Sequence, residues 1–302
     1  MTYSPALSDQ VILITGASTG IGAALAKVLA AKAMGIRLVL ASRNQEKLQQ
    51  IADLCSKAGA DVFVVSTDLT QIEQVQALAK SVIERFGRVD VLVNNAGYGQ
   101  MGPIELIPIS SAQKQFNVNL LGPLALTQAL IPVMREQGGG RIINISSLGG
   151  RLAFPFGGLY SSSKFALEGI SDALRMELAA FNIKVSVIEP GPVSTEFFDV
   201  AGQMVEQAVT NPENTPYKSA FEKLKNLEKN TSSRAWTSER VAEVIIKAIT
   251  TPHPRARYVA ATGGDFLLFV MNKLLPTAAV DAFWKRFYGL DQVAKDWQNR
   301  QK

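Results

Sequence analysis

The chain has 302 residues but only one cysteine, Cys55, and one histidine, His253. A single cysteine excludes a disulfide within the chain and is typical of a reducing compartment. We expect Cys55 to be a small apolar residue of a helix. His253 lies between two prolines in a segment that predicts a loop. A single histidine in that setting does not favour a histidine-based metal site or a Ser-His-Asp triad. We therefore expect no metal, and chemistry that depends on other side chains.

Charged residues are also scarce, at 19%, and the basic residues behind the net charge of +5 are scattered rather than clustered. That pattern does not favour a nucleic-acid surface. The 47% of hydrophobic residues supplies a core and argues against disorder. Residues 1–10 lack the basic start and apolar run of a signal peptide, and no apolar stretch reaches the length of a membrane span. We expect a cytoplasmic protein.

What the chain does contain is a series of short apolar runs that alternate with helical patterns. The runs predict strands at 11–14, 37–41, 62–65, 89–93, 141–145, 184–188 and 258–260. Continuous apolar strands are typical of a parallel sheet covered on both faces. We predict an α/β fold: a single doubly wound (Rossmann-type) domain over 1–302, with a parallel sheet of about seven strands, helices on both faces and a C-terminal helical extension. Ligands bind at the carboxyl edge of such sheets.

A glycine-rich turn follows the first strand. Gly16, Gly20 and Gly22 precede a helical pattern at 23–34. Such a turn offers bare backbone N–H groups to an anion at the positive end of the helix dipole. The spacing Gly-x3-Gly-x-Gly differs from the common dinucleotide fingerprint Gly-x-Gly-x2-Gly. A tight turn without a ligand is the alternative.

The second strand ends in Ser42-Arg43-Asn44. In dinucleotide-binding folds an acidic residue here accepts hydrogen bonds from the ribose of NAD and would repel a 2′-phosphate. Arg43 instead offers a planar fork suited to a phosphate. The sequence therefore favours NADP(H) over NAD(H). The alternative is that Arg43 is a solvated residue at the start of a helix.

Polar residues also follow the later strands. Two adjacent asparagines, Asn94 and Asn95, come after the fourth strand, where they need hydrogen-bond partners. Tyr160 and Lys164 lie four residues apart, on one face of a predicted helix. A phenol beside an ammonium is a plausible proton donor and acceptor at neutral pH. The Tyr-x3-Lys spacing alone arises often by chance, so its significance depends on the other residues.

Taken in order, these motifs resemble the short-chain dehydrogenase/reductase family. The matching residues are Thr15-Gly16-x3-Gly20-Ile21-Gly22, Asn94-Asn95-Ala96-Gly97, Asn119, Ser147, Tyr160-x3-Lys164 and Pro190-Gly191. They cover roughly residues 8–200 in the family's order, and the interval of thirteen residues between Ser147 and Tyr160 selects Ser147 over Ser146.

The resemblance implies a nucleotide cofactor and the residues that hold it. Arg43 would meet the 2′-phosphate and Asp68 the adenine. The other cofactor-binding residues would be Gly16, Ser18, Thr19, Gly20, Ile21, Gly22, Asn95, Ala96, Gly97, Pro190, Gly191, Val193 and Thr195, with Tyr160 and Lys164 at the nicotinamide ribose. Many NADP-dependent members carry a basic residue where this chain has Thr19, so the NADP preference depends mainly on Arg43.

The resemblance also implies hydride transfer between the nicotinamide and a secondary alcohol or carbonyl. Ser147 would place the substrate oxygen, Tyr160 would exchange the proton, and Lys164 would lower the pKa of Tyr160. Asn119, through a water, would link Lys164 to solvent. Bringing a phenol from a pKa of ~10 to ~7 takes about 4 kcal/mol, which one cation at about 4 Å supplies at an effective dielectric of ~20.

The last third of the chain is expected to set the substrate. Residues 194–235 would form a lid, and four aromatic residues, Phe154, Phe156, Phe197 and Phe198, suit a lipophilic substrate and a role in lipid metabolism. The alternative is that these rings pack the core. The segment 263–302 resembles the endings of family members that act on steroids, retinoids and similar lipids.

We rank three functions for that tail: a cover for the pocket, a subunit contact, and contact with a membrane surface through Lys273, Lys285 and Arg286. Family members often form dimers or tetramers, so we expect a homo-oligomer. Three further functions remain open. They are a β-ketoacyl-type reductase, a catalytically silent NADP(H)-binding regulator, and a peripheral membrane protein whose tail is the working part.

Overall fold

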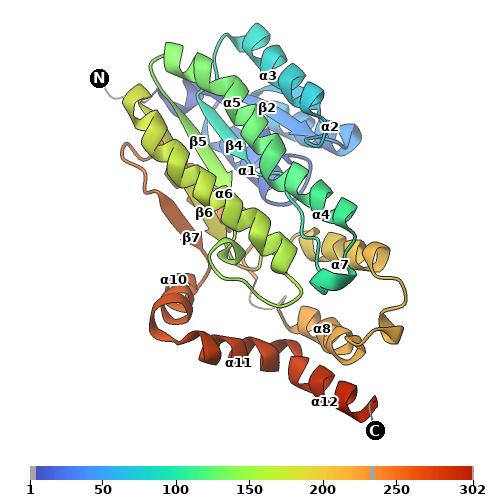
Figure 1. Ribbon diagram of the computed structural model, residues 1–302. Coiled ribbons are helices and arrows are strands. Elements are labelled where there is room, and N and C mark those ends of the chain that lie inside the picture. The colour runs from blue at the N-terminus through green and yellow to red at the C-terminus, as the bar shows by residue number, and fades with distance from the viewer. Residues whose placement is uncertain (1–4, 232–234, 301–302) are drawn as a thin grey trace.

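A computed structural model describes residues 5–231 and 235–300, apart from the side chains of 225–231. Seven parallel strands form one sheet in the order β3-β2-β1-β4-β5-β6-β7 (Figure 1). The strands are β1 Val11–Thr15, β2 Arg37–Ser42, β3 Asp61–Ser66, β4 Val91–Asn94, β5 Gly140–Ile145, β6 Ile183–Pro190 and β7 Arg257–Ala260. The predicted doubly wound sheet is confirmed.

Helices cover both faces of the sheet (Figure 1). Their bounds are α1 Gly20–Lys32, α2 Gln45–Lys57, α3 Ile72–Phe86, α4 Ile109–Phe116, α5 Gly122–Glu136, α6 Gly158–Glu177, α7 Phe197–Ala208, α8 Lys218–Thr231, α9 Ser238–Thr250, α10 Gly264–Phe269, α11 Thr277–Tyr288 and α12 Leu290–Arg300. In β1, Ile12 and Ile14 pack on the face that carries α1, α2 and α9. Val11 and Leu13 point to the opposite face, which carries α3 and α5. The continuous apolar run is therefore explained by burial on both sides.

The direction in which strands are added reverses between β1 and β4. The chain builds outward through β2 and β3, returns to place β4 beside β1, and then continues outward to β7. At such a switch point the connections leave neighbouring strand ends in opposite directions and open a crevice. The glycine-rich turn after β1 and the asparagines after β4 meet at this crevice.

One long helical stretch contains an irregular turn. A π turn at Asn117–Leu121 separates α4 from α5, just before the Gly122-Pro123 pair at which the sequence predicts a kink. Gly122 is required by close packing, because a Cβ there would collide with the carbonyl oxygen of Leu69 and lie 2.8 Å from its Cβ. The π turn aims Asn119 inward.

The same stretch corrects one expectation from the sequence. Ile109–Glu136 is long and apolar enough, by length and composition, to cross a membrane, so the statement that no segment reaches that length is wrong. Its inner side includes Leu126, Leu130 and Met134, which are fully buried against the sheet. Burial of this kind is what a helix of a protein core requires, and it accounts for the apolar composition.

The single cysteine and histidine lie away from the crevice. Cys55 is buried on the inner side of α2, and burial raises the pKa of its thiol to about 11, so the thiol is unreactive. His253 is exposed in the loop between α9 and β7. Within 5–231 and 235–300, no three His, Cys, Asp or Glu side chains gather as a metal site would need.

The C-terminal extension forms an arm. Figure 1 shows α10, α11 and α12 running below the carboxyl edge of the sheet, with α8 beside α12. A π turn at Val270–Leu274 joins α10 to α11. Leu268 and Met271 pack on Leu152, and Trp284 joins the same cluster. The arm is thereby attached to the loop that precedes α6.

Candidate active site

The glycine-rich turn is shaped to receive an anion. Gly16 and Gly20 have φ values of +65° and +54°, in the region that favours glycine. At Gly22, a Cβ would collide with the carbonyl oxygen of Gly16 and lie 2.6 Å from the Asn95 amide nitrogen. Thr19 precedes α1, and its side chain caps no N–H of the helix within the described chain. The first N–H groups of α1 thus remain available for a phosphate.

Asn95 holds this turn in place. Its Nδ2 donates to the carbonyl oxygens of Thr15 and Gly16, at 2.9 and 3.2 Å. The Thr15 hydroxyl in turn accepts from the backbone N–H groups of Asn95 and Ala96. The amide side chain therefore joins the ends of β1 and β4. The neighbouring Asn94 instead donates from its Nδ2 to Thr127 and Asn144, while its buried Oδ1 has no hydrogen-bond partner among the described residues.

A cleft of about 1890 Å³ runs from the glycine turn to the aromatic loop and the tail. At its β2 end it is lined by Arg43, which is exposed, and by Lys47, which pairs with Glu196 at 3.1 Å across the opening. Asp68 also lines the cleft, and its Oδ1 accepts from the N–H and hydroxyl of Thr70. Two cations therefore flank the position where a 2′-phosphate would lie.

Tyr160 and Lys164 share one face of α6, as the spacing predicts. They are 8% and 5% exposed. The Lys164 ammonium lies 5.9 Å from the centre of the Tyr160 ring and donates to the carbonyl oxygen of Ile145 at 2.8 Å. Burial lowers the pKa of Lys164 to about 8, and the charge of Glu168 opposes that shift.

Ser147 stands at the end of β5, facing Tyr160. Its hydroxyl is hydrogen-bonded to the Tyr160 phenol and accepts from the Gly149 N–H at 3.0 Å. The adjacent Ser146 is 3% exposed and packs under Gly150 instead. Of the two serines, Ser147 is therefore the one that contacts the Tyr160 hydroxyl.

Asn119 reaches the same centre from the π turn. Its Nδ2 donates to the Tyr98 carbonyl at 2.9 Å and to the Ser163 hydroxyl at 3.0 Å, while its Oδ1 accepts from the Tyr98 N–H. A Cβ on Gly97 would lie 3.2 Å from Asn119 Oδ1 and 3.3 Å from Lys164 Nζ, so both groups approach the same point. The water link between them stays a prediction.

The expected lowering of the Tyr160 pKa is not what the protein's own groups produce. Burial raises the pKa of Tyr160 to about 12, opposed by the hydrogen bond from Ser147. The physical reason is that the phenol is desolvated on all sides. The Lys164 ammonium is directed to the Ile145 carbonyl instead of the phenol oxygen. The unassisted protein therefore keeps this phenol protonated at neutral pH.

Four of the residues expected to bind the cofactor lie at the end of β6 and just beyond it. Pro190, Gly191, Val193 and Thr195 all line the cleft. A Cβ on Gly191 would lie 2.8 Å from the Cβ of Ala261, so the position accepts only glycine without rearrangement. The Thr195 hydroxyl accepts from the Phe197 N–H and orients the start of α7.

The four aromatic residues proposed for the pocket lie on the cleft wall. The ring of Phe197 packs 5.5 Å from that of Tyr160, and Phe198 packs on Phe197. Phe154 stacks on Tyr288 of α11 at 6.0 Å and 10°. Phe156 contacts the same tyrosine. These rings pack against one another and also line the cleft. The tail covers part of the cleft, which is the first of the three functions ranked for the tail.

Other lining residues had no signal in the sequence. They are Lys47, Tyr98, Met101, Phe221, Trp284, Phe287 and Tyr288. Tyr288 is distant from Tyr160 along the chain, and only the path of the tail brings the two into one cleft. The predicted lid at 194–235 is described only in part, since residues 232–234 and the side chains of 225–231 lie outside the described residues.

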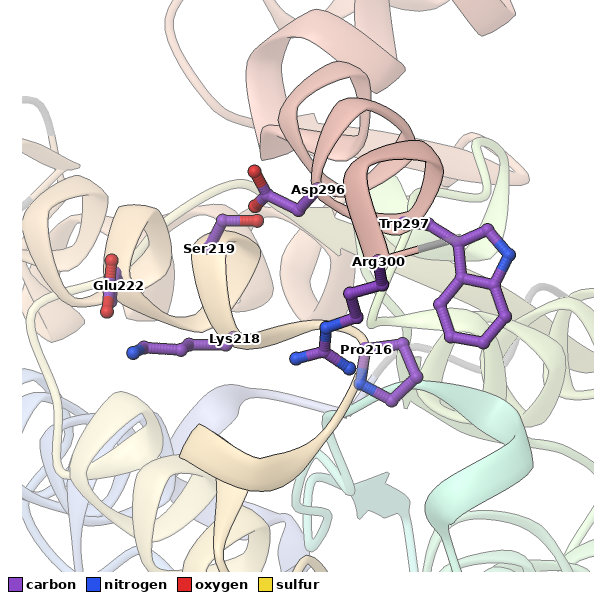
Figure 2. A pocket seen from close by; sticks show the side chains of 7 residues that line it. All are labelled: Pro216, Lys218, Ser219, Glu222, Asp296, Trp297 and Arg300. Atoms are coloured by element: carbon purple, nitrogen blue, oxygen red, sulfur yellow. The ribbon is translucent and has the colours of Figure 1, made fainter. Parts of the chain in front are cut away.

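A second, smaller pocket of about 320 Å³ lies between α8 and α12. Figure 2 shows Arg300 of α12 extending toward Pro216, with Lys218 and Asp296 nearby. Side chains of both charge signs surround the opening, so it selects neither anions nor cations. It belongs to the contact between the lid and the tail.

Comparisons with known proteins agree with this geometry. The family model described as short chain dehydrogenase matches residues 10–206. The human 17-beta-hydroxysteroid dehydrogenase type 1 is 33% identical over 256 residues, covering 83% of this chain and 77% of that protein. The ketoacyl reductase HetN of Nostoc sp. is 31% identical over 300 residues, covering 98% of this chain and 95% of that protein.

Solved structures show the same fold with bound nucleotides. A short chain dehydrogenase/reductase from Burkholderia phymatum, in complex with NAD, has a TM-score of 0.78 and 27% identity, over 90% of this chain and 95% of that one. A metagenomic short-chain oxidoreductase in complex with NADP has a TM-score of 0.66 and 30% identity, over 83% of this chain and 96% of that one. The chain therefore belongs to the short-chain dehydrogenase/reductase family of oxidoreductases.

Proposed function

We propose that the protein is an NADP(H)-dependent oxidoreductase that interconverts a secondary alcohol and a carbonyl on a lipophilic substrate. One observation carries the proposal: Tyr160, Lys164 and Ser147 converge at the point where the glycine-lined half of the cleft meets its aromatic half. A cofactor in the first half and an apolar carbonyl compound in the second would both reach Tyr160.

Each side chain has a defined task. Ser147 donates a hydrogen bond to the substrate oxygen and sets its position against Tyr160, which supplies or removes the proton. Lys164 binds the nicotinamide ribose and places a positive charge beside Tyr160. Asn119, through a water, connects Lys164 to solvent. NADP(H), when bound, supplies or accepts the hydride.

The preference for NADP(H) is supported by charge. Arg43 and Lys47 both line the β2 end of the cleft, and Arg43 can form a bidentate contact with a phosphate. One similar structure holds NADP and another holds NAD, so the fold itself accepts either nucleotide. The preference proposed here therefore depends on these two cations of this chain.

A lipophilic substrate is supported by the aromatic wall and by the likeness to a hydroxysteroid dehydrogenase. The likeness to a ketoacyl reductase over nearly the full chain favours a second candidate, the reduction of acyl-linked β-keto groups. The tail favours the first candidate, because Trp284 and Tyr288 line the cleft with rings that suit a rigid apolar body.

The experiment is a screen of lipophilic ketones and a β-ketoacyl thioester, with NADPH and NADH in parallel. We expect NADPH oxidation with at least one bulky ketone and slower oxidation with the thioester. Faster thioester turnover would favour the second candidate. Cofactor binding without oxidation of any substrate would indicate the catalytically silent regulator instead.

The outer side of the tail supports a membrane contact. Phe266 and Phe269 of α10 are 72% and 53% exposed, and Lys273, shortly after them, and Lys285 of α11 are exposed as well. Aromatic rings among cations are typical of surfaces that lie on anionic lipid. Flotation with anionic liposomes measures this contact.

Two further expectations have their own tests. Light scattering measures the proposed dimer or tetramer, and cell fractionation checks the expected cytoplasmic location.

A further inference from the structure

A buried carboxylate lies one helical turn beyond Lys164. Glu168 is on α6 and 5% exposed. Its Oε2 accepts from Arg257 Nε at 3.0 Å, and its Oε1 is buried with no hydrogen-bond partner among the described residues. A buried carboxylate with one oxygen unpaired is costly to fold, so its presence calls for a physical reason.

Lys164 and Glu168 run side by side beneath Gly150. A Cβ on Gly150 would lie 3.2 Å from the Lys164 Cβ and 3.3 Å from the Glu168 Cγ, and it would collide with the Ser146 hydroxyl. The absence of a side chain at Gly150 therefore allows the pair to pack closely against the loop after β5. The first atoms of both side chains therefore lie against the same point of that loop.

Arginines hold the other acids of this region. Glu189 of β6 is fully buried between Arg151 at 3.0 Å and Arg257 at 3.4 Å, and burial, with the charge of Glu168, raises its pKa. Asp172, one turn beyond Glu168, contacts Arg257 at 2.7 Å.

Tyr160 is the remaining ionisable side chain of α6 that lies near Lys164. Its pKa is raised to about 12, so it is neutral at physiological pH. Glu168 is the carboxylate whose charge acts on Lys164.

The electrostatic effect has a definite sign. Burial alone favours the neutral amine of Lys164 and lowers its pKa, while the negative charge of Glu168 favours the ammonium and raises it. Without that charge, the effect of burial on the pKa of Lys164 would be less opposed. Lys164 would then lose its proton at a lower pH than in the native protein.

We propose that Glu168 is a positioning residue that keeps the Lys164 side chain cationic and aligned beside Tyr160. The proposal rests on the role of Lys164 in the proposed function. Glu168 is not among the residues that line the cleft, so it would act through Lys164 and not by contact with a bound ligand.

The test compares two variants that lose the same kind of contact. Glu168→Gln removes the carboxylate next to Lys164, and Asp172→Asn removes one that shares Arg257 but lies a turn further on. The pH dependence of kcat/KM for ketone reduction is measured for both. We expect the alkaline limb of Glu168→Gln to move about one pH unit lower, because a nearby opposite charge shifts a pKa by roughly that amount or more. Asp172→Asn should keep the native limb.

Three outcomes would overturn the proposal. They are an unchanged limb in Glu168→Gln, an equal shift in both variants, and a loss of activity that is uniform across pH. If Glu168→Gln does not fold, Glu168→Met removes the charge without leaving an amide to satisfy, and it carries the same prediction.

A second measurement separates this proposal from the proposed function. The titration of Lys164 is followed directly by carbon NMR on protein with labelled lysine, with Lys164→Arg to assign the signal. A lower midpoint in Glu168→Gln supports the proposal even if the native protein reduces no ketone, which would count against the function alone. An unchanged midpoint overturns the proposal even if turnover is observed.

Discussion

The proposed chemistry depends on Tyr160, whose side chain is buried in the cleft wall. Burial raises its pKa to about 12, while its hydroxyl stays hydrogen-bonded to Ser147. A phenol in this state is protonated at neutral pH, as a donor to a carbonyl oxygen must be. The sequence motif singled out the residue, but it did not reveal that desolvation outweighs the hydrogen bond from Ser147.

The lowered pKa of Lys164 predicts how reduction depends on pH. Lys164 is a cation below its pKa of about 8 and loses the charge above it. If ketone reduction requires the cation, kcat/KM should be constant below that value and fall tenfold per unit above it. A profile measured from neutral to strongly alkaline pH checks this. A rate that stays constant far above the pKa would contradict the role given to Lys164.

Arg43 should determine the choice of nucleotide. A charge-assisted bidentate contact contributes about 1.5–3 kcal/mol, so Arg43→Ala should raise the KM for NADPH roughly 10- to 100-fold and leave that for NADH nearly unchanged. Lys47→Ala, at the other cation of this end of the cleft, should have a smaller effect in the same direction, because Lys47 is paired with Glu196. Equal losses with both nucleotides would show that Arg43 does not read the phosphate.

At the scale of elements, the glycine turn depends on close packing. In Gly22→Ala the new methyl group would meet the Gly16 carbonyl and the Asn95 amide. We expect a loss of about 1–3 kcal/mol in the free energy of unfolding and weaker nucleotide binding. In Gly169→Ala, in α6, no described heavy atom lies within 4 Å of the methyl position. That control should gain about 0.5–1 kcal/mol. Chemical denaturation measures both.

Helix α11 should control the size of the substrate that is accepted. Tyr288 stacks on Phe154 and lines the cleft, so Tyr288→Ala should raise the KM for a bulky apolar ketone by about tenfold, the value of a lost aromatic contact, and leave a small ketone unaffected. Phe266→Ala, an exposed aromatic of α10, should change neither. An equal loss with both ketones would place Tyr288 outside the substrate site.

Across the whole molecule, the strands were predictable because each is a short apolar run buried on both faces. Every strand end lies within two residues of its predicted position, as for β4, predicted at 89–93 and found at Val91–Asn94. The site residues at strand ends followed from the same logic. The placement of Asn119 by a π turn did not, because a π turn has no distinct sequence pattern.

The sequence also did not predict which residues of distant segments would contribute to the site. Phe221 and Tyr288 reach the cleft from the lid and the tail, and nothing in their local spacing distinguishes them from core aromatics. Glu168 looks like an ordinary helix residue until burial shows that it lies beside Lys164. Such contacts depend on how remote segments pack, which periodicity does not encode.

The central claim is that Tyr160 transfers the proton, with Ser147 and Lys164 supporting that step. Single-turnover oxidation of bound NADPH by a lipophilic ketone, in the native protein and in Tyr160→Phe, tests it most directly. We predict that NADPH binds both proteins with similar affinity, while the oxidation rate falls at least ~100-fold in the variant, the scale of general acid catalysis. Oxidation at the native rate in Tyr160→Phe would contradict the account.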